Sequence, residues 1–214
     1  MLPFGDDRLD RRALKSLRFK WLANYSYAEY LQDFANAIDR GNGGSSELAA
    51  LPSEDPRAKA LNWIKNEDKV EDQDSGSSTF VTEDLPIALA LERFVAATVY
   101  YSVVGEKSDP DASHELETSF GFLGTDSICN WRSQFFLGIW CNQEKKVEEV
   151  TIHNVADLAG TIPSEIALLQ DLEKLHISGL TGMSTMPSQL GSLEKLKTLL
   201  LRKYSRPHYF SRMS

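Results

Sequence analysis

The chain has 214 residues, of which 42% are hydrophobic and 25% charged, as in an ordinary soluble protein of one or two domains. Its formal net charge of −8 at pH 7 argues against a nucleic-acid partner, because such partners select for a basic surface. No run of about 18 apolar residues occurs, so no transmembrane helix is expected, and the first residues lack the apolar segment of a signal peptide.

The first fifty residues predict a helical extension that ends in a linker. Apolar residues recur at roughly helical spacing from Leu14 to Ile38. The run Gly-Asn-Gly-Gly-Ser-Ser at 41–46 then ends the helix. Residues 1–50 are therefore expected to form an extension and a Gly/Ser linker without a core of their own.

A second helical region is predicted over residues 51–146. The stretch 57–66 predicts a short helix, and the largely apolar stretch 87–103 predicts a buried central helix. The acidic and Ser/Gly-rich run 68–78 predicts a flexible loop, and residues 105–122 are also expected to be a loop. The residues expected on the buried side of the first helix are Ala60, Leu61, Trp63 and Ile64.

The chain contains two cysteines, Cys129 and Cys141, and each adjoins a tryptophan (Trp131 or Trp140) within two residues. The pair is either a disulfide, which requires an oxidising compartment, or two unrelated buried thiols. A reactive pair is disfavoured, because Arg132 is the only evident basic neighbour that could lower a thiol pKa. The disulfide is favoured because the pair lies just before a set of repeats, whose exposed end needs a cap. Both tryptophans are expected in the core rather than in a carbohydrate site.

The segment 147–201 contains a sequence that recurs at an offset of 24 residues. The tripeptide Ile162-Pro163-Ser164 recurs as Met186-Pro187-Ser188, and the leucines that follow recur with it. A fixed period in the twenties with apolar residues at the repeating positions is typical of a solenoid. The pattern apolar-x-x-apolar-x-apolar at 147–152, 172–177 and 196–201 predicts three strands with apolar side chains inward.

The intervening residues of the three predicted strands point outward and, stacked in parallel, would form a small polar surface. This surface is the predicted ligand-binding site. Its predicted residues are Glu149, Thr151, His153, Lys174, His176, Ser178, Thr198 and Arg202, with Leu200 as the one apolar outward position.

The stretch Leu158-Ala-Gly160-Thr-Ile162-Pro163, continued to Ile177, closely resembles the plant-type leucine-rich repeat, L-x-G-x-I-P-x-x-L-x-x-L-x-x-L-x-x-L-x-L. The two cysteines resemble the paired-cysteine N-terminal cap of receptor-like proteins with such repeats. The stretch Ala60-Leu-Asn-Trp63-Ile, together with the central helix, resembles the caps of leucine-rich-repeat proteins of diatoms. The resemblance covers about residues 51–201.

The resemblance implies an α/β fold in which a helical N-terminal region and cap precede a short leucine-rich-repeat solenoid with parallel strands. The expected boundaries are 1–50 for the extension, 51–146 for the cap, 147–201 for two repeats and a partial third, and 202–214 for an irregular tail. Relatives of this type are secreted or membrane-anchored, which implies an extracellular location, although the chain itself shows no signal peptide or anchor.

The repeats depart from the family pattern. Ala156 and Leu180 stand where the family has an asparagine that bonds successive turns, so the buried backbone groups need other partners. The first unit is also one residue longer than the second. A solenoid generally needs three or more units and a closing cap, so the last strand, with Leu199 and Leu201, is expected to be an adhesive edge.

No catalytic, metal or cofactor site is expected. His153 and His176 could be neighbours and, with Glu149, suggest a metal or acid–base site, but no third ligand is fixed. The favoured function is a non-catalytic interaction module that binds a protein, peptide or glycan. The alternative is a structural capping fragment that assembles end to end, with itself or another chain, through the open repeat edge.

Overall fold

The computed structural model describes residues 51–71, 78–80, 87–104, 110–133, 137–153, 155, 158–181 and 186–203. The predicted N-terminal extension and linker, 1–50, and most of the predicted tail, 204–214, lie outside the described residues.

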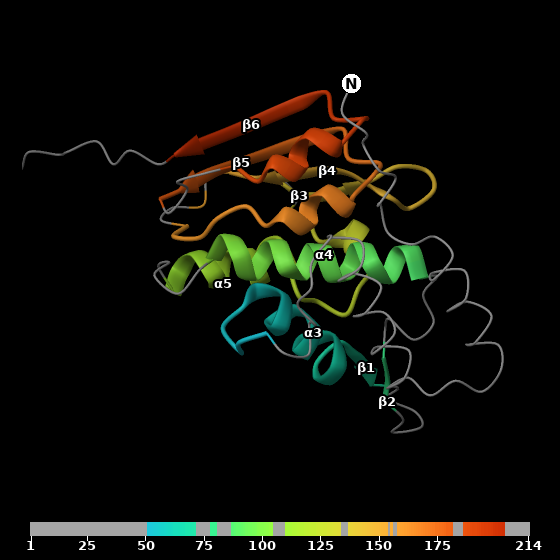
Figure 1. Cartoon of the computed structure of the whole chain (residues 1–214). Coiled ribbons are helices and arrows are strands. Elements are labelled where there is room, and N and C mark those ends of the chain that lie inside the picture. The colour runs from blue at the N-terminus through green and yellow to red at the C-terminus, as the bar shows by residue number, and fades with distance from the viewer. Residues whose placement is uncertain are drawn as a thin grey trace, which may run out of the picture.

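A four-stranded sheet in the order β3-β4-β5-β6 forms one layer of the molecule (Figure 1). β3 (Gly138–Cys141) pairs antiparallel with β4 (Val147–Ile152). β4, β5 (Lys174–Leu180) and β6 (Thr198–Lys203) run parallel to one another. The sheet is open, with β3 and β6 at its edges, and with the helices beneath it the described chain has an α/β fold.

The strand register follows the repeat in the sequence. Val150 lies opposite Leu175, which lies opposite Leu199, so equivalent positions of successive repeats are neighbours across the strands. The spacing is 25 residues in the first step and 24 in the second, as the sequence predicts. The three predicted strands are therefore confirmed, with the predicted inward residues of the first two buried.

β5 and β6 begin two residues later than expected. The N–H groups of Leu172 and Leu196 donate to the carbonyls of Leu169 and Leu193, at 3.0 and 3.2 Å, so these leucines still belong to turns. Each turn follows a short 3₁₀ helix that connects two parallel strands. These helices are η3 (Ser164–Leu168) and η4 (Ser188–Ser192).

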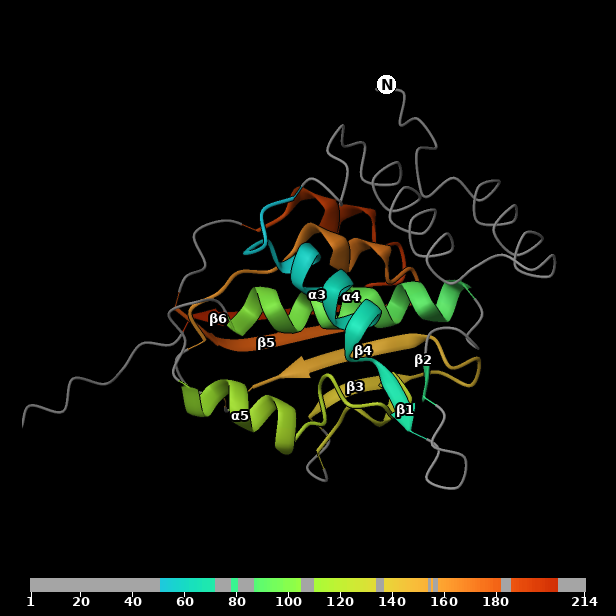
Figure 2. The same ribbon diagram turned by 90° about the horizontal axis from the view of Figure 1, so that it is seen from below.

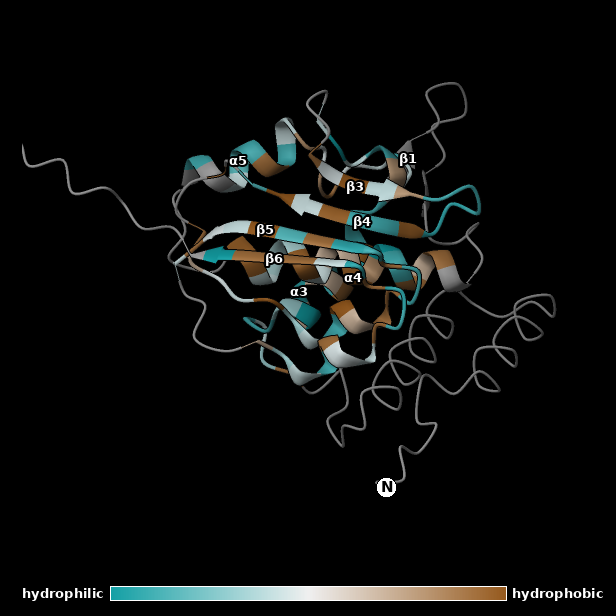
Figure 3. Ribbon diagram, turned by 90° about the horizontal axis from the view of Figure 1, so that it is seen from above, coloured by the Kyte–Doolittle hydropathy of each residue, from teal (hydrophilic) through white to brown (hydrophobic). Residues whose placement is uncertain are grey.

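Helices cover one side of the sheet. α4 (Ile87–Val104) lies beneath the strands with η3, and α3 (Pro56–Asn66) packs against the far side of α4 (Figure 2). Both predicted helices are confirmed, and the predicted buried side of α3 is buried. Viewed from the opposite side, the sheet lies in front of both helices (Figure 3). No helix in the described ranges has the length and apolarity needed to cross a bilayer.

Two segments predicted as loops contain regular structure. Residues 110–118 form helix α5, because Leu116 is fully buried and the Tyr100 hydroxyl of α4 donates to Glu117. Its two apolar residues, Ala112 and Leu116, are too few to show a helical periodicity, so tertiary contacts rather than the sequence pattern decide this element. The predicted loop 68–78 contributes β1 (Lys69–Glu71), which pairs antiparallel with β2 (Ser78–Phe80).

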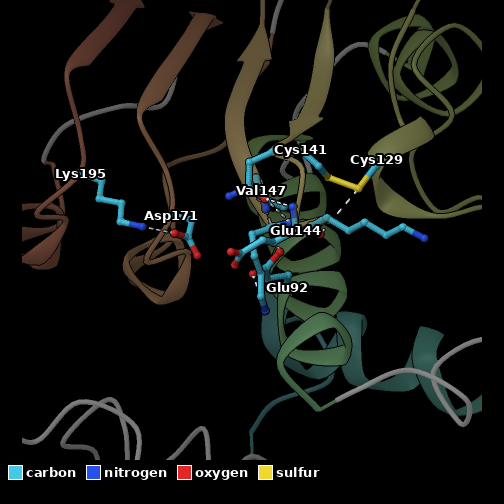
Figure 4. Close-up of polar contacts among 10 residues, drawn as sticks. Glu92, Cys129, Cys141, Glu144, Val147, Asp171 and Lys195 are labelled. Atoms are coloured by element: carbon cyan, nitrogen blue, oxygen red, sulfur yellow. Dashed lines mark hydrogen bonds and ion pairs between the residues drawn. A yellow bond between two sulfur atoms is a disulfide. The ribbon is translucent and has the colours of Figure 1, made fainter.

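Two adjacent charged residues fix the apolar helix α4 in place. The carboxylate of Glu92 accepts from the N–H of Val147, at 2.9 Å, and from Lys146 at 3.2 Å, which ties the helix to the start of β4 (Figure 4). Burial raises the pKa of Glu92. Arg93, the next residue, turns to a different neighbour and forms a bidentate ion pair with Asp68, with distances of 2.8 and 2.5 Å.

The first turn after β4 closes the C-terminal end of α4. Gly160 and Thr161 donate their N–H groups to the carbonyls of Val103 and Ser102, at 3.0 and 2.9 Å. These carbonyls have no partner within the helix, so the turn acts as its C-terminal cap. A Cβ at Gly160 would lie 1.7 Å from the Ser102 oxygen, so only glycine allows this approach.

The predicted disulfide between Cys129 and Cys141 is confirmed, with a Cα–Cα distance of 5.4 Å. It joins η2 (Ile128–Asn130) to the end of β3 (Figure 4). The cap segment is therefore covalently attached to the edge of the sheet.

Other groups supply hydrogen bonds in the region of the missing asparagines. Leu180 is buried, and Thr181 beside it donates both its N–H and its hydroxyl to the carbonyl of Leu158, at 2.7 and 3.2 Å. The N–H of Leu158 donates to the carbonyl of Gly179 at 3.1 Å. Successive turns are thus joined by hydrogen bonds from backbone N–H groups and a threonine hydroxyl. Ala156, the other position without the asparagine, lies outside the described residues.

Candidate ligand-binding surface

The outer face of the sheet is the side opposite α4. No described helix lies over β4, β5 or β6 on this side (Figure 3). The strands alternate, so that Val150, Leu175 and Ile177 are buried against the helices while the residues between them face outward. The predicted outward residues therefore lie on one face, and most of them are half-buried or exposed.

Glu149 and Lys174 form an ion pair on the outer face where β5 begins, with 2.9 Å between the carboxylate oxygen and Nζ. Both side chains are more than one third exposed, so the pair contributes little to stability, about 0–1 kcal/mol. Thr198 on β6 is exposed and lies opposite Lys174. This row is polar and electrically neutral.

His153 and His176 are stacked, with ring centroids 4.7 Å apart and an angle of 27° between the ring planes. Desolvation lowers the pKa of His176 below its ordinary value, and the basic neighbours His153, Arg202 and Lys174 lower it further. The neutral form of His176 is therefore favoured in the unliganded protein. The prediction that His153 and His176 are neighbours is confirmed.

The strand ends bring Ser178 and Arg202 together. Ser178 on β5 lies opposite Arg202 on β6, and the arginine side chain is exposed. Thr151 is the exception among the predicted contact residues, since it is only 3% exposed and its hydroxyl has no hydrogen-bond partner. Its side chain is shorter than that of His176 opposite, so it lies below the accessible surface and is not available to a ligand.

The outer face also includes two residues that the sequence analysis did not assign to it. Trp140 on β3 lies opposite Glu149 and is half-buried, so its predicted place in the core is wrong, whereas Trp131 is fully buried as expected. The Arg132 guanidinium lies 4.2 Å from the centre of the Trp140 ring. The alternation of Ile139 and Trp140 before Cys141 is the signal that could have revealed this strand.

The buried centre of the cap is Arg93, which lies between two tryptophans. Its guanidinium is 5.2 Å from the Trp63 ring and 5.0 Å from the Trp131 ring. It also donates to the carbonyls of Gly124 and Asp126, at 2.6 and 2.7 Å. Every group around this cation is a structural partner, so the cluster holds the cap together and is closed to ligands.

The outer face offers no evident site for a metal ion. No group of three or more His, Cys, Asp or Glu side chains that could hold a metal lies within the described ranges. The two stacked histidines have Lys174 as a neighbour, and its positive charge disfavours a cation. No protein-family model matches the chain, and no curated protein sequence matches it significantly.

The last repeat is less covered than the one before it. Met186 and Leu199 are 58% and 41% exposed, whereas Ile162 and Leu175, their equivalents one repeat earlier, are 5% and 0% exposed. The last repeat packs on the repeat before it, but within the described residues no further repeat packs on the last one. The end of the repeat stack beside β6 is therefore an apolar surface.

Proposed function

We propose that the chain is a non-catalytic interaction module that binds a protein, peptide or glycan through the outer face of β4, β5 and β6. The observation that carries the proposal is a sheet face that no described helix covers, with polar side chains in rows and a continuous apolar core behind it. A face of this kind is rigid, so its side chains are held in position before a ligand arrives.

We further propose that residues 147–203 are a short leucine-rich-repeat solenoid. The sequence grammar of the repeat, the parallel register at 24–25 residues and the turns that bond to one another support this assignment. The disulfide between the cap and β3 is in keeping with a receptor-like protein in an oxidising compartment.

The test begins with ligands selected against the full chain from a random peptide display library and from an oligosaccharide array. Ser178→Trp places a bulky side chain on the outer face, and Gln189→Trp places the same side chain on the exposed surface of η4 as a control. The selected ligands are expected to bind Ser178→Trp at least tenfold more weakly and Gln189→Trp as tightly as the parent chain. Ligands that bind Ser178→Trp at full affinity would show that the outer face is not the binding surface.

A second candidate function is assembly through the open end of the repeats. The exposure of Met186 and Leu199 favours it, because the equivalent side chains one repeat earlier are covered by the next repeat. Among the described residues no strand pairs with the outer edge of β6, which leaves this edge open to another strand. In this role the chain acts as a capping fragment of a larger assembly.

A further inference from the structure

The charge on the outer face is unevenly distributed along the strands. At or just before the strand beginnings lie three carboxylates and two amines (Glu148, Glu149, Glu173, Lys174 and Lys197), with 2.6 Å between the Lys197 amine and the Glu173 carboxylate. The strand ends carry His153, Ser178 and Arg202 and no carboxylate among the described outward positions. One end of the face is thus weakly acidic and the other basic, on a chain whose net charge is −8.

The histidine pair lies within the basic end. The charged groups that face His176 are His153 on β4, Lys174 on its own strand and Arg202 on β6. Glu149, a carboxylate in the outward row nearest the strand beginnings, accepts a hydrogen bond from Lys174. A proton on the His176 imidazole therefore meets other positive charges, and a bound carboxylate is what would relieve this repulsion.

An acidic peptide fits this site better than a glycan does. A sugar ring binds flat against an exposed aromatic face, but the guanidinium of Arg132 lies over the Trp140 ring, and the two histidine rings cover one another. The groups that remain available are N–H donors: the guanidinium of Arg202 and the imidazoles of His153 and His176. Carboxylates accept hydrogen bonds from such donors, and the negative charge of the rest of the chain would repel an acidic partner from other surfaces.

We propose that the strand ends of β4, β5 and β6 bind an acidic peptide segment of a partner protein through Arg202, His176 and His153, and that binding tightens as the histidines gain protons. The inference rests on the proposed function, because it uses the same outer face. A carboxylate bound here favours the protonated imidazoles, so the complex takes up protons and its affinity rises as the pH falls through and below the ordinary histidine range.

The test measures binding of a fluorescent, end-blocked hexaglutamate peptide to the full chain by anisotropy at pH 7.5 and 5.5. Hexaglutamine serves as the uncharged control peptide. The affinity for hexaglutamate is expected to rise about five- to tenfold at the lower pH, since one favourable charge contact at a surface changes affinity about two- to fivefold. Hexaglutamine is expected not to bind.

Variants locate the binding site on the outer face. Arg202→Gln is expected to weaken hexaglutamate binding about two- to fivefold at both pH values, and His153→Gln with His176→Gln to abolish the rise at pH 5.5. Lys197→Gln removes the same charge from the other end of β6 and is expected to leave binding unchanged. An equal loss in Lys197→Gln and Arg202→Gln, or a pH response that survives the double histidine change, would overturn the inference.

A sulfated polysaccharide, heparin, separates failure of this inference from failure of the proposed function. In one outcome, heparin binds the parent chain but not Ser178→Trp, and hexaglutamate does not bind. The outer face is then a ligand surface, but the assignment of an acidic peptide is wrong. If hexaglutamate binds equally to the parent chain, Arg202→Gln and Ser178→Trp, both the inference and the use of the outer face for this ligand are wrong.

Discussion

At the scale of single residues, the cap is organised around one buried cation. Arg93 is flanked by two tryptophan rings, pairs with Asp68 and donates to two backbone carbonyls, so all of its donor groups face fixed partners. Removing one member of a buried ion pair leaves the other charge without compensation, which costs far more than loss of a surface pair. The stability of the cap should therefore be very sensitive to Asp68.

Asp68→Asn is expected to lower the free energy of unfolding by about 3–5 kcal/mol, because it leaves the Arg93 charge buried without a counter-charge. Glu173→Gln, which breaks the exposed pair with Lys197, is expected to change it by less than about 1 kcal/mol. Urea denaturation of both variants gives the comparison. A loss below about 1 kcal/mol in Asp68→Asn would mean that the pair does not hold the cap together.

At the scale of elements, contacts between neighbouring helices, strands and turns determine how these elements are arranged. The turn at Gly160 closes the C-terminal end of α4, Glu92 of α4 binds the start of β4, and the disulfide attaches η2 to β3. The helical cap and the repeats thus share one continuous core, although they differ in sequence pattern.

Gly160→Ala is expected to destabilise the protein by at least about 2 kcal/mol, since the new Cβ would collide with the backbone of α4. Gly191→Ala is the matched control, because no atom lies within 4 Å of its added Cβ, and its effect should stay within about 0.5 kcal/mol. Thermal and urea unfolding measure both. Equal effects of the two changes would contradict the close approach at Gly160.

Changing both Cys129 and Cys141 to serine is expected to lower the free energy of unfolding by about 2–3 kcal/mol, as for a disulfide that closes a short loop. A reducing agent should destabilise the parent chain by a similar amount and leave the double variant unchanged. Mass spectrometry should show a gain of two hydrogen atoms in the parent chain on reduction, because each sulfur of the disulfide becomes a thiol. A parent chain that shows no such gain would lack the bond.

The sequence predicts those elements in which the spacing of apolar residues follows the residues that are buried. The apolar alternation around Val150 and Leu175 predicts β4 and β5, and the long apolar run predicts α4. α5 could not be predicted, because two apolar residues, Ala112 and Leu116, do not define a period. Of the candidate site, the sequence places the outward residues correctly but not the burial of Thr151, which depends on the sizes of its neighbours across the strands.

At the scale of the whole molecule, the two ends of the repeat stack differ. At the β3 end, η2 packs against β3 and is joined to it by the disulfide, whereas the β6 end exposes Leu199 and Met186. Apolar side chains beside an unpaired strand edge favour association with another strand or another chain.

The chain is expected to associate at increasing concentration in sedimentation velocity experiments, and Leu199→Glu is expected to shift it toward the monomer. Thr198→Glu adds the same charge to the neighbouring exposed position on the opposite face of β6 and should leave the association unchanged. A parent chain that stays monomeric at all accessible concentrations would count against assembly through the β6 end.

The difference between the β3 end and the β6 end also implies that local unfolding differs from strand to strand and is easiest at β6. Each strand of the sheet is stabilised by its neighbours. Within the described part of the chain, β4 pairs with a strand on both sides and bonds to Glu92, whereas β6 pairs with β5 alone. Amide hydrogen exchange should therefore be slowest in β4 and fastest in β6. Because Arg202 belongs to β6, a ligand that binds it would slow exchange first in the strand that opens most readily.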